Sequence, residues 1–171
     1  GGGGVMAAQI ECAERAEELV TWSKFHPRGC RGLNTGGWDA RFASIPVVEF
    51  CEKSNRESFV AIQIETLGAV EDVDAIAAMD GGDLLFVGPS DLSQSLGITG
   101  DFMNPKCLEA IEQIAAACKK HGKHWGAVCV NPEHGAMMID TSCKMLSPTS
   151  DGKIINSGIQ AVKAKYAAYF G

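Results

Sequence analysis

Two carboxylates stand out in this sequence of 171 residues because each closes an apolar run. Glu65 ends "FVAIQIE", and Asp91 follows "LLFVGP" one strand–helix unit later. If the two runs are neighbouring parallel strands, their axes lie about 5 Å apart and both carboxylates can reach one cation. Two oxygen ligands that leave other coordination positions open suit Mg²⁺ or Mn²⁺ acting as a Lewis acid.

The same two residues also have a plainer interpretation, in which Asp91 caps the turn "PSDLSQS" and Glu65 is a surface residue at a strand end. Two features favour the metal site. Gly88 lets the backbone approach a ligand closely, and the N–H groups after Pro89 can point into the site. The strand face that carries Gln63 and Glu65 becomes polar at the end where parallel α/β folds place their sites.

Apolar runs alternate with helical patterns along the whole chain. We expect strands near residues 5–10, 58–65, 83–88, 124–130 and 142–147, and an amphipathic C-terminal helix near 153–169. No hairpin signal separates the runs, so the pattern predicts one α/β domain over 1–171 with a parallel sheet, either open and doubly wound or rolled into a barrel. No dinucleotide fingerprint or phosphate-binding loop is present, which disfavours a nucleotide-binding open sheet.

Local signals place two of the helices. In "NPKCLEAIEQIAAACKKHGK", Asn104 is expected as the N-cap, Pro105 as the first helical residue and Gly122 as the stop. The segment "LGAVEDVDAIAAMDG" predicts a single helix with Gly81 as its C-cap.

The composition limits the classes of partner that the protein can be expected to bind. A net charge of −6 offers no basic face to nucleic acid or to an anionic membrane, and no run approaches the roughly 18 to 20 apolar residues of a membrane span. The seven cysteines are scattered without a C-x-x-C pair, which indicates reduced thiols and a cytoplasmic protein. Small molecules, metal cations or other subunits are the expected partners.

The central segment "IQIETLGAVEDVDAIAAMDGGDLLFVGPSDLSQSLGITG" resembles the signature of the HpcH/HpaI aldolase/citrate lyase family of class II pyruvate aldolases. The similarity continues through "AERAEELVTWSKFHPRGCRG" and "NPKCLEAIEQIAAACKKHGKHWGAV". It implies a TIM (β/α)8 barrel of the pyruvate/phosphoenolpyruvate type, of which this chain holds about the last five βα units and lacks the N-terminal third.

The resemblance also implies roles for the residues above. Glu65 and Asp91 would bind Mg²⁺ or Mn²⁺, with Co²⁺ as a further candidate, and the reaction would cleave or form 4-hydroxy-2-oxo acids through a metal-bound pyruvate enolate. The residues implied in binding pyruvate, oxaloacetate or the larger oxo acid are Gln63, Gly88, Pro89, Ser90 and Asp91. Arg28 and Arg31 would lie near a subunit boundary of a trimer or hexamer, and a purely structural role for them is equally open.

Two departures from the family keep alternatives open. No position matches the acid–base histidine or the pyruvate-binding arginine that the family carries on its first three strands, so the catalytic residues are unknown and the chain alone is expected to be inactive. The ending "SCKMLSPTSDG" departs from the family pattern. An oxaloacetate decarboxylase or a macrophomate synthase-like enzyme using the same enolate is therefore an alternative, as is a non-catalytic partial barrel that serves as a scaffold or binding subunit.

Other chemistries have less support in the sequence. A Schiff-base aldolase needs a lysine projecting from a strand, and Lys144 alone lies within an expected one. The four histidines fall in a loop, at a helix end, at a strand start and on a helix, which are ordinary structural positions.

Overall fold

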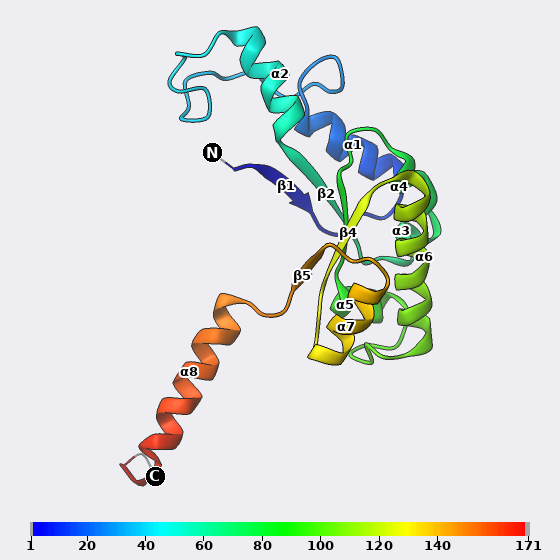
Figure 1. Ribbon diagram of the computed structural model, residues 1–171, viewed down its shortest axis with the longest axis vertical. Helices are drawn as coiled ribbons and strands as arrows, with labels where there is room; N and C mark the ends of the chain where they lie inside the picture. Colours follow the sequence, from blue (N-terminus) through cyan, green and yellow to red (C-terminus); the bar gives the residue numbers. More distant parts are fainter. Residues whose placement is uncertain (1, 170–171) are drawn as a thin grey trace.

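The computed structural model describes residues 2–169 (Figure 1). Within them, parallel strands form one sheet in which the spatial order repeats the chain order. A doubly wound sheet would reverse its order at a switch point, whereas a barrel adds each strand beside the previous one. The open doubly wound alternative is thus excluded. The strands are β1 (Gly4–Ala7), β2 (Phe59–Ile64), β3 (Leu84–Val87), β4 (His124–Val128) and β5 (Met145–Ser147).

The helices are distributed unevenly around this sheet. In Figure 1, α1, α4 and α6 lie along one face, α5 and α7 lie below the strands, and α8 projects away from the sheet. Helices on one face only are typical of a barrel wall. The helices are α1 (Ala13–Ser23), α2 (Val47–Glu57), α3 (Leu67–Glu71), α4 (Val73–Ala78), α5 (Pro89–Ser95), α6 (Pro105–His121), α7 (Pro132–Asp140), α8 (Asp151–Lys165) and a final 3-10 turn, Ala167–Tyr169.

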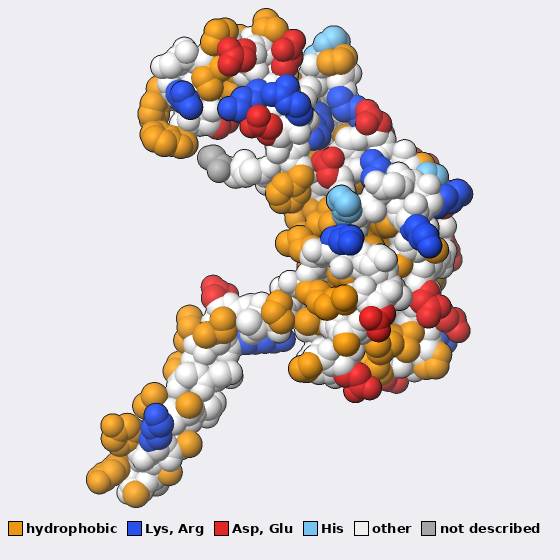
Figure 2. Space-filling view, in the orientation of Figure 1, with side chains coloured by type: hydrophobic (Ala, Val, Ile, Leu, Met, Phe, Trp, Pro, Cys, Tyr) orange, Lys and Arg blue, Asp and Glu red, His pale blue; other side chains and the backbone are white. Residues whose placement is uncertain are grey.

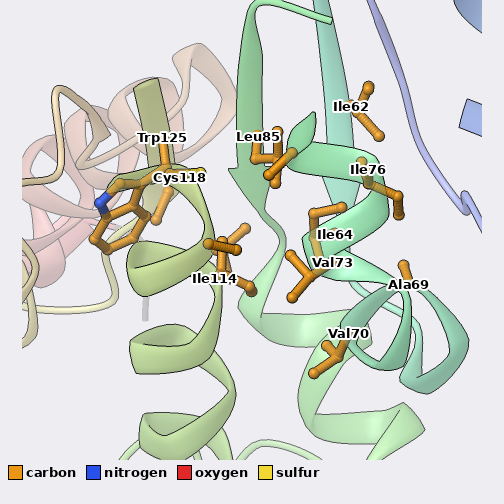
Figure 3. Packing of buried hydrophobic residues seen from close by; sticks show 14 of the residues in the cluster. Ile62, Ile64, Ala69, Val70, Val73, Ile76, Leu85, Ile114, Cys118 and Trp125 are labelled. Carbon is orange, nitrogen blue, oxygen red and sulfur yellow. The ribbon is translucent and has the colours of Figure 1, made fainter. Parts of the chain in front are cut away.

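The core lies between the sheet and these covering helices. Ile62 and Ile64 alternate along β2, are fully buried and pack in one cluster with Ile76 of α4 and Ile114 of α6 (Figure 3). The opposite face is open at the start of β2, where Phe59 is 44% exposed, but buried farther along at Ala61. Figure 2 shows a hollow on this side of the molecule with hydrophobic side chains along its wall. The alternation expected for β2 is therefore present, with one face buried under helices.

Element ends differ from expectation where the backbone leaves regular geometry. β1 stops at Ala7, not at residue 10, because Gln9 adopts a left-handed backbone with φ +55°. β5 starts at Met145, not at 142, because Ser142 has φ +70°. Left-handed residues cannot continue a strand.

The predicted limits of one helix are confirmed, and the prediction of a single helix between β2 and β3 is wrong. α6 begins and ends as predicted: the Asn104 side chain accepts a hydrogen bond from the Lys106 N–H, and Gly122 forms a left-handed C-cap with φ +66°. The single helix expected between β2 and β3 is instead two helices that meet at Asp72. The C-cap of α4 is Met79 rather than Gly81, whose left-handed backbone belongs to the following turn.

The C-terminal helix begins at Asp151, two residues earlier than expected, because the Ser150 side chain caps it by accepting from the Lys153 N–H. Its apolar residues, including Ile154 and Ile159, remain exposed. No helix within residues 2–169 combines the length and the apolar character that crossing a membrane requires.

Candidate active site

Glu65 follows β2 at the carboxyl end of the sheet, and its side chain is buried, with 1% exposure. Oε1 accepts hydrogen bonds from the backbone N–H of Gln9 at 2.8 Å and from the Gln9 side-chain amide at 3.0 Å. Oε2 accepts from the side-chain amide of Gln63. All three donors are neutral amides, and the ion pairs found among residues 2–169 involve other carboxylates.

This carboxylate is therefore held in place but not neutralised. A buried charge is costly unless it is paired with an opposite charge or coordinates a metal. The hydrogen bonds to Glu65 offset part of that cost, and a cation would offset the rest. The donor set of hard oxygens fits a divalent cation such as Mg²⁺ or Mn²⁺.

Gly88 makes room for this arrangement. The sheet register pairs Ile64 with Val87, so Gly88 lies beside Glu65 at the same edge. A Cβ atom at residue 88 would collide with Oε2 of Glu65 and with the amide nitrogen of Gln63. The Gly88 backbone itself is extended, with φ −99°, so the requirement for glycine is steric and comes from the Glu65 carboxylate.

Asp91 lies in the first turn of α5 and its side chain is exposed. The segment expected to be a turn is a short helix whose N-cap is Gly88, without a side-chain capping bond, so the interpretation of Asp91 as a cap is wrong. A hydrogen bond of 2.8 Å from the Leu67 N–H to Ser95 Oγ ties α5 to the turn that follows Glu65. The two carboxylates therefore belong to neighbouring turns at one edge of the sheet.

The structure groups the expected site residues in two sets. Gln63, Glu65 and Gly88 are in direct contact, whereas Pro89, Ser90 and Asp91 follow in the first turn of α5. Across the described chain, no cluster of three or more His, Cys, Asp or Glu side chains has the arrangement of a metal site. The amides support Glu65, and the pairing of Glu65 with Asp91 in one centre stays a prediction.

Arg28 and Arg31 lie elsewhere. The Arg28 guanidinium donates to both carboxylate oxygens of Glu17, at 2.7 and 2.8 Å, and to the carbonyl of Asp80 in the turn before β3. This pairing raises the pKa of Arg28 and lowers the pKa of Glu17.

Arg31 packs its guanidinium 4.7 Å from the centre of the Phe25 ring and 3.8 Å from the Asp39 carboxylate. It also lines a hollow with Gly4 and Phe59, the first residues of β1 and β2. Within this chain both arginines are therefore at the amino ends of the strands, opposite Glu65, and are held by their own neighbours.

Gln9 is the contact residue that the sequence interpretation missed. Residues 5–10 were expected to be one strand, and in such a strand the backbone N–H and the side chain of one residue point in different directions. The position of Gln9 could have indicated this contact. It is a polar residue two positions beyond β1, at the same edge of the sheet as the end of β2.

His134 is the one histidine among residues 2–169 that is buried, with 1% exposure. Its Nδ1 accepts a weak hydrogen bond from the Val130 N–H at 3.4 Å, and its Nε2 has no partner. Burial lowers the pKa of this imidazole. It lines a small pocket between α6 and α7 together with Leu108, Ile111 and Met138, outside the cluster around Glu65.

The sequence of this chain is similar to that of a known protein family. The model of the HpcH/HpaI aldolase/citrate lyase family matches residues 1–157. The chain is 32% identical over 151 residues to a 5-keto-4-deoxy-D-glucarate aldolase of Klebsiella pneumoniae subsp. pneumoniae, covering 88% of this chain and 58% of that relative. The chain therefore spans little more than half the length of that curated relative.

Two solved structures are similar to the fold. One is an HpcH/HpaI aldolase from Desulfitobacterium hafniense DCB-2, with a TM-score of 0.82, 29% identity, and coverage of 95% of this chain and 64% of that one. The other is the citrate synthase SbnG, with a TM-score of 0.85, 26% identity, and coverage of 98% and 64%. The five-stranded sheet described above thus corresponds to part of a TIM-barrel aldolase.

Proposed function

Because the chain belongs to the HpcH/HpaI aldolase/citrate lyase family, we propose that it is part of a divalent-metal-dependent carbon–carbon lyase that cleaves or forms 4-hydroxy-2-oxo acids. Glu65 and Asp91 hold Mg²⁺ or Mn²⁺ in this proposal, with Co²⁺ as a further candidate. The observation that carries it is the buried Glu65 carboxylate, which is fixed by three neutral N–H donors and has no cationic partner in the described chain.

The bound cation would supply Lewis-acid polarisation of the oxo group of the substrate. The chain's own residues then have separate tasks. Gln9 and Gln63 keep the Glu65 carboxylate in one orientation, and Gly88 leaves space beside it. The N–H groups at the start of α5 have no acceptor within the helix and can donate to the oxygens of a small oxo acid. Gly88, Ser90 and Asp91 supply these N–H groups, whereas Pro89 has no N–H and only sets the backbone of the first helical residue.

The relatives suggest where to begin with substrates. The Klebsiella relative is named for 5-keto-4-deoxy-D-glucarate, so this compound is the first substrate to test. Oxaloacetate is the second, because loss of its carboxylate yields the same enolate as aldol cleavage; a macrophomate synthase-like reaction would share that chemistry. Pyruvate is the common product to detect.

Because the chain alone is expected to be inactive, the assay uses the complete enzyme of which it is proposed to be part. Pyruvate release is coupled to lactate dehydrogenase, with and without EDTA. We expect Glu65→Gln and Asp91→Asn each to lower the metal-dependent rate by at least about 100-fold, since each removes a charged ligand. The matched controls are Glu52→Gln and Asp140→Asn, which change exposed carboxylates on α2 and α7 and should keep the wild-type rate. Full activity of the Glu65→Gln, Asp91→Asn double variant would refute the metal site, and metal-free activity of the wild type would refute the reaction class.

Assembly is a separate part of the proposal. We expect a homo-oligomer, a trimer or a hexamer, with the loop that carries Arg28 and Arg31 at the subunit contact. Support comes from the same loop, in which Trp38 and Phe42 are 75% and 66% exposed. Multi-angle light scattering measures the mass, and a monomer at micromolar concentration would contradict this part.

A further inference from the structure

Gln9 makes two hydrogen bonds to a single oxygen of Glu65. We propose that Gln9 is a positioning residue that fills Oε1 of Glu65 and so leaves Oε2 as the oxygen that faces the cation. This inference rests on the metal site of the proposed function, and it adds to that site a residue from a different strand end.

The acceptor capacity of the carboxylate supports this assignment. Each oxygen of an ionised carboxylate offers about two lone-pair sites. The backbone N–H and the side-chain amide of Gln9 use both sites of Oε1, at 2.8 and 3.0 Å. Oε2 receives one donor, the amide of Gln63, and therefore keeps one site open. The two oxygens of Glu65 are thus unequal before any cation binds.

The conformation of Gln9 explains how one residue can supply both donors. In a strand, the backbone N–H lies in the sheet plane while the side chain stands perpendicular to it, so the two cannot converge on one atom. With φ +55°, Gln9 leaves the strand geometry that ends at Ala7. A left-handed backbone is unfavourable for a residue with a side chain.

The neighbouring residues keep this turn in register with Glu65. Ile10 is buried in the main core, and its carbonyl accepts a hydrogen bond of 2.7 Å from Thr66 Oγ1. Thr66 directly follows Glu65 and also caps α3 by accepting from the Ala69 N–H at 3.1 Å. The Ile10–Thr66 bond therefore follows the Gln9–Glu65 contact, and the pairing of β1 with β2, which ends at Ala7 and Ile62, precedes it. Such supporting contacts orient metal ligands in proteins.

The test measures Mn²⁺ binding to the full chain by electron paramagnetic resonance, without substrate. Gln9→Gly removes the side-chain donor, keeps the backbone N–H and accepts the left-handed backbone without strain. We expect its Mn²⁺ dissociation constant to rise about tenfold, as for other residues that support a metal ligand. The melting temperature should stay within about 2 °C of the wild type, because relief of backbone strain offsets part of the lost hydrogen bond.

A second variant and two controls complete the test. Gln9→Asn also tolerates the left-handed region but carries a shorter amide, so it should weaken Mn²⁺ binding as well. Gln160→Ala, on exposed α8, should leave binding unchanged. Wild-type affinity in both Gln9 variants, with binding lost in Glu65→Gln, would overturn the positioning role and leave the metal site standing. Wild-type affinity in Glu65→Gln would instead overturn the metal site itself.

Discussion

Replacing Gly88 by alanine tests the central steric claim about the site. The added Cβ atom would overlap Oε2 of Glu65 and the amide nitrogen of Gln63, which are already hydrogen-bonded to each other. The neighbours cannot yield easily, because Oε1 of the same carboxylate is held by Gln9. We therefore expect Glu65 to leave its position in the Gly88→Ala protein.

The expected loss of stability depends on the displacement of the Glu65 and Gln63 side chains by the added methyl group. Inserting a methyl group into a well-packed place costs about 1–3 kcal/mol, and a displaced hydrogen bond to a charged group costs about 1.5–3 kcal/mol. Because the two terms describe one rearrangement, we expect a loss of about 2 kcal/mol in the free energy of unfolding. For a chain of this size that loss lowers the melting temperature by about 4–8 °C. The Mn²⁺ dissociation constant should rise by about 10- to 100-fold, since a ligand is misplaced.

Urea unfolding and Mn²⁺ titration measure the two effects separately. Gly32→Ala is the matched control, because a Cβ at Gly32 meets no atom within 4 Å and should change neither quantity. A Gly88→Ala protein with wild-type stability and wild-type Mn²⁺ affinity would show that the Glu65 carboxylate is not where the structure places it. Loss of stability alone, with Mn²⁺ affinity kept, would separate the packing argument from the metal site.

Three further predictions concern other buried groups. Burial lowers the pKa of His134, so the unfolded chain binds more protons than the folded chain. The free energy of unfolding should therefore fall by up to about 1.4 kcal/mol per pH unit as the pH drops below about 6.5. His134→Gln should flatten this slope in urea titrations. Burial raises the pKa of the Cys118 thiol to about 11, so Cys118 should react with a thiol reagent only on unfolding, whereas exposed Cys30 should react in the native chain; equal rates would contradict this. Lys24→Met should cost about 1–3 kcal/mol in the free energy of unfolding, because the buried ammonium donates to the carbonyls of Asn55 and Ser58 at the end of α2; unchanged stability would refute that role.

The sequence predicted the features that depend on local chemistry. The alternation that buries Ile62 and Ile64 follows from the period of a strand, and the limits of α6 follow from the Asn104 cap and the Gly122 stop. The place of Glu65 at the edge of the sheet was predictable for the same reason. Whether it binds a metal stays a prediction.

Other features depend on contacts between distant segments, which a pattern cannot show. The partner of Gln9 is 56 residues away, and no glycine or proline marks its left-handed turn. The break at Asp72 has a similar origin, since its carboxylate accepts a hydrogen bond of 2.9 Å from the Ala13 N–H at the start of α1. For α8, periodicity indicated an apolar face but could not indicate what, if anything, covers it.

The ends of three strands each contribute a different feature of the site, which explains why the donors to Glu65 are neutral amides. β1 leads to neutral donors at Gln9, β2 to the charge of Glu65, and β3 to the space at Gly88. An arginine or lysine in place of Gln9 would hold the carboxylate more strongly, but it would also neutralise it, and a divalent cation would then gain little from binding. Amides fix the geometry and leave the charge available. The stability lost by burying an unneutralised carboxylate is therefore the physical basis of the proposed cation affinity.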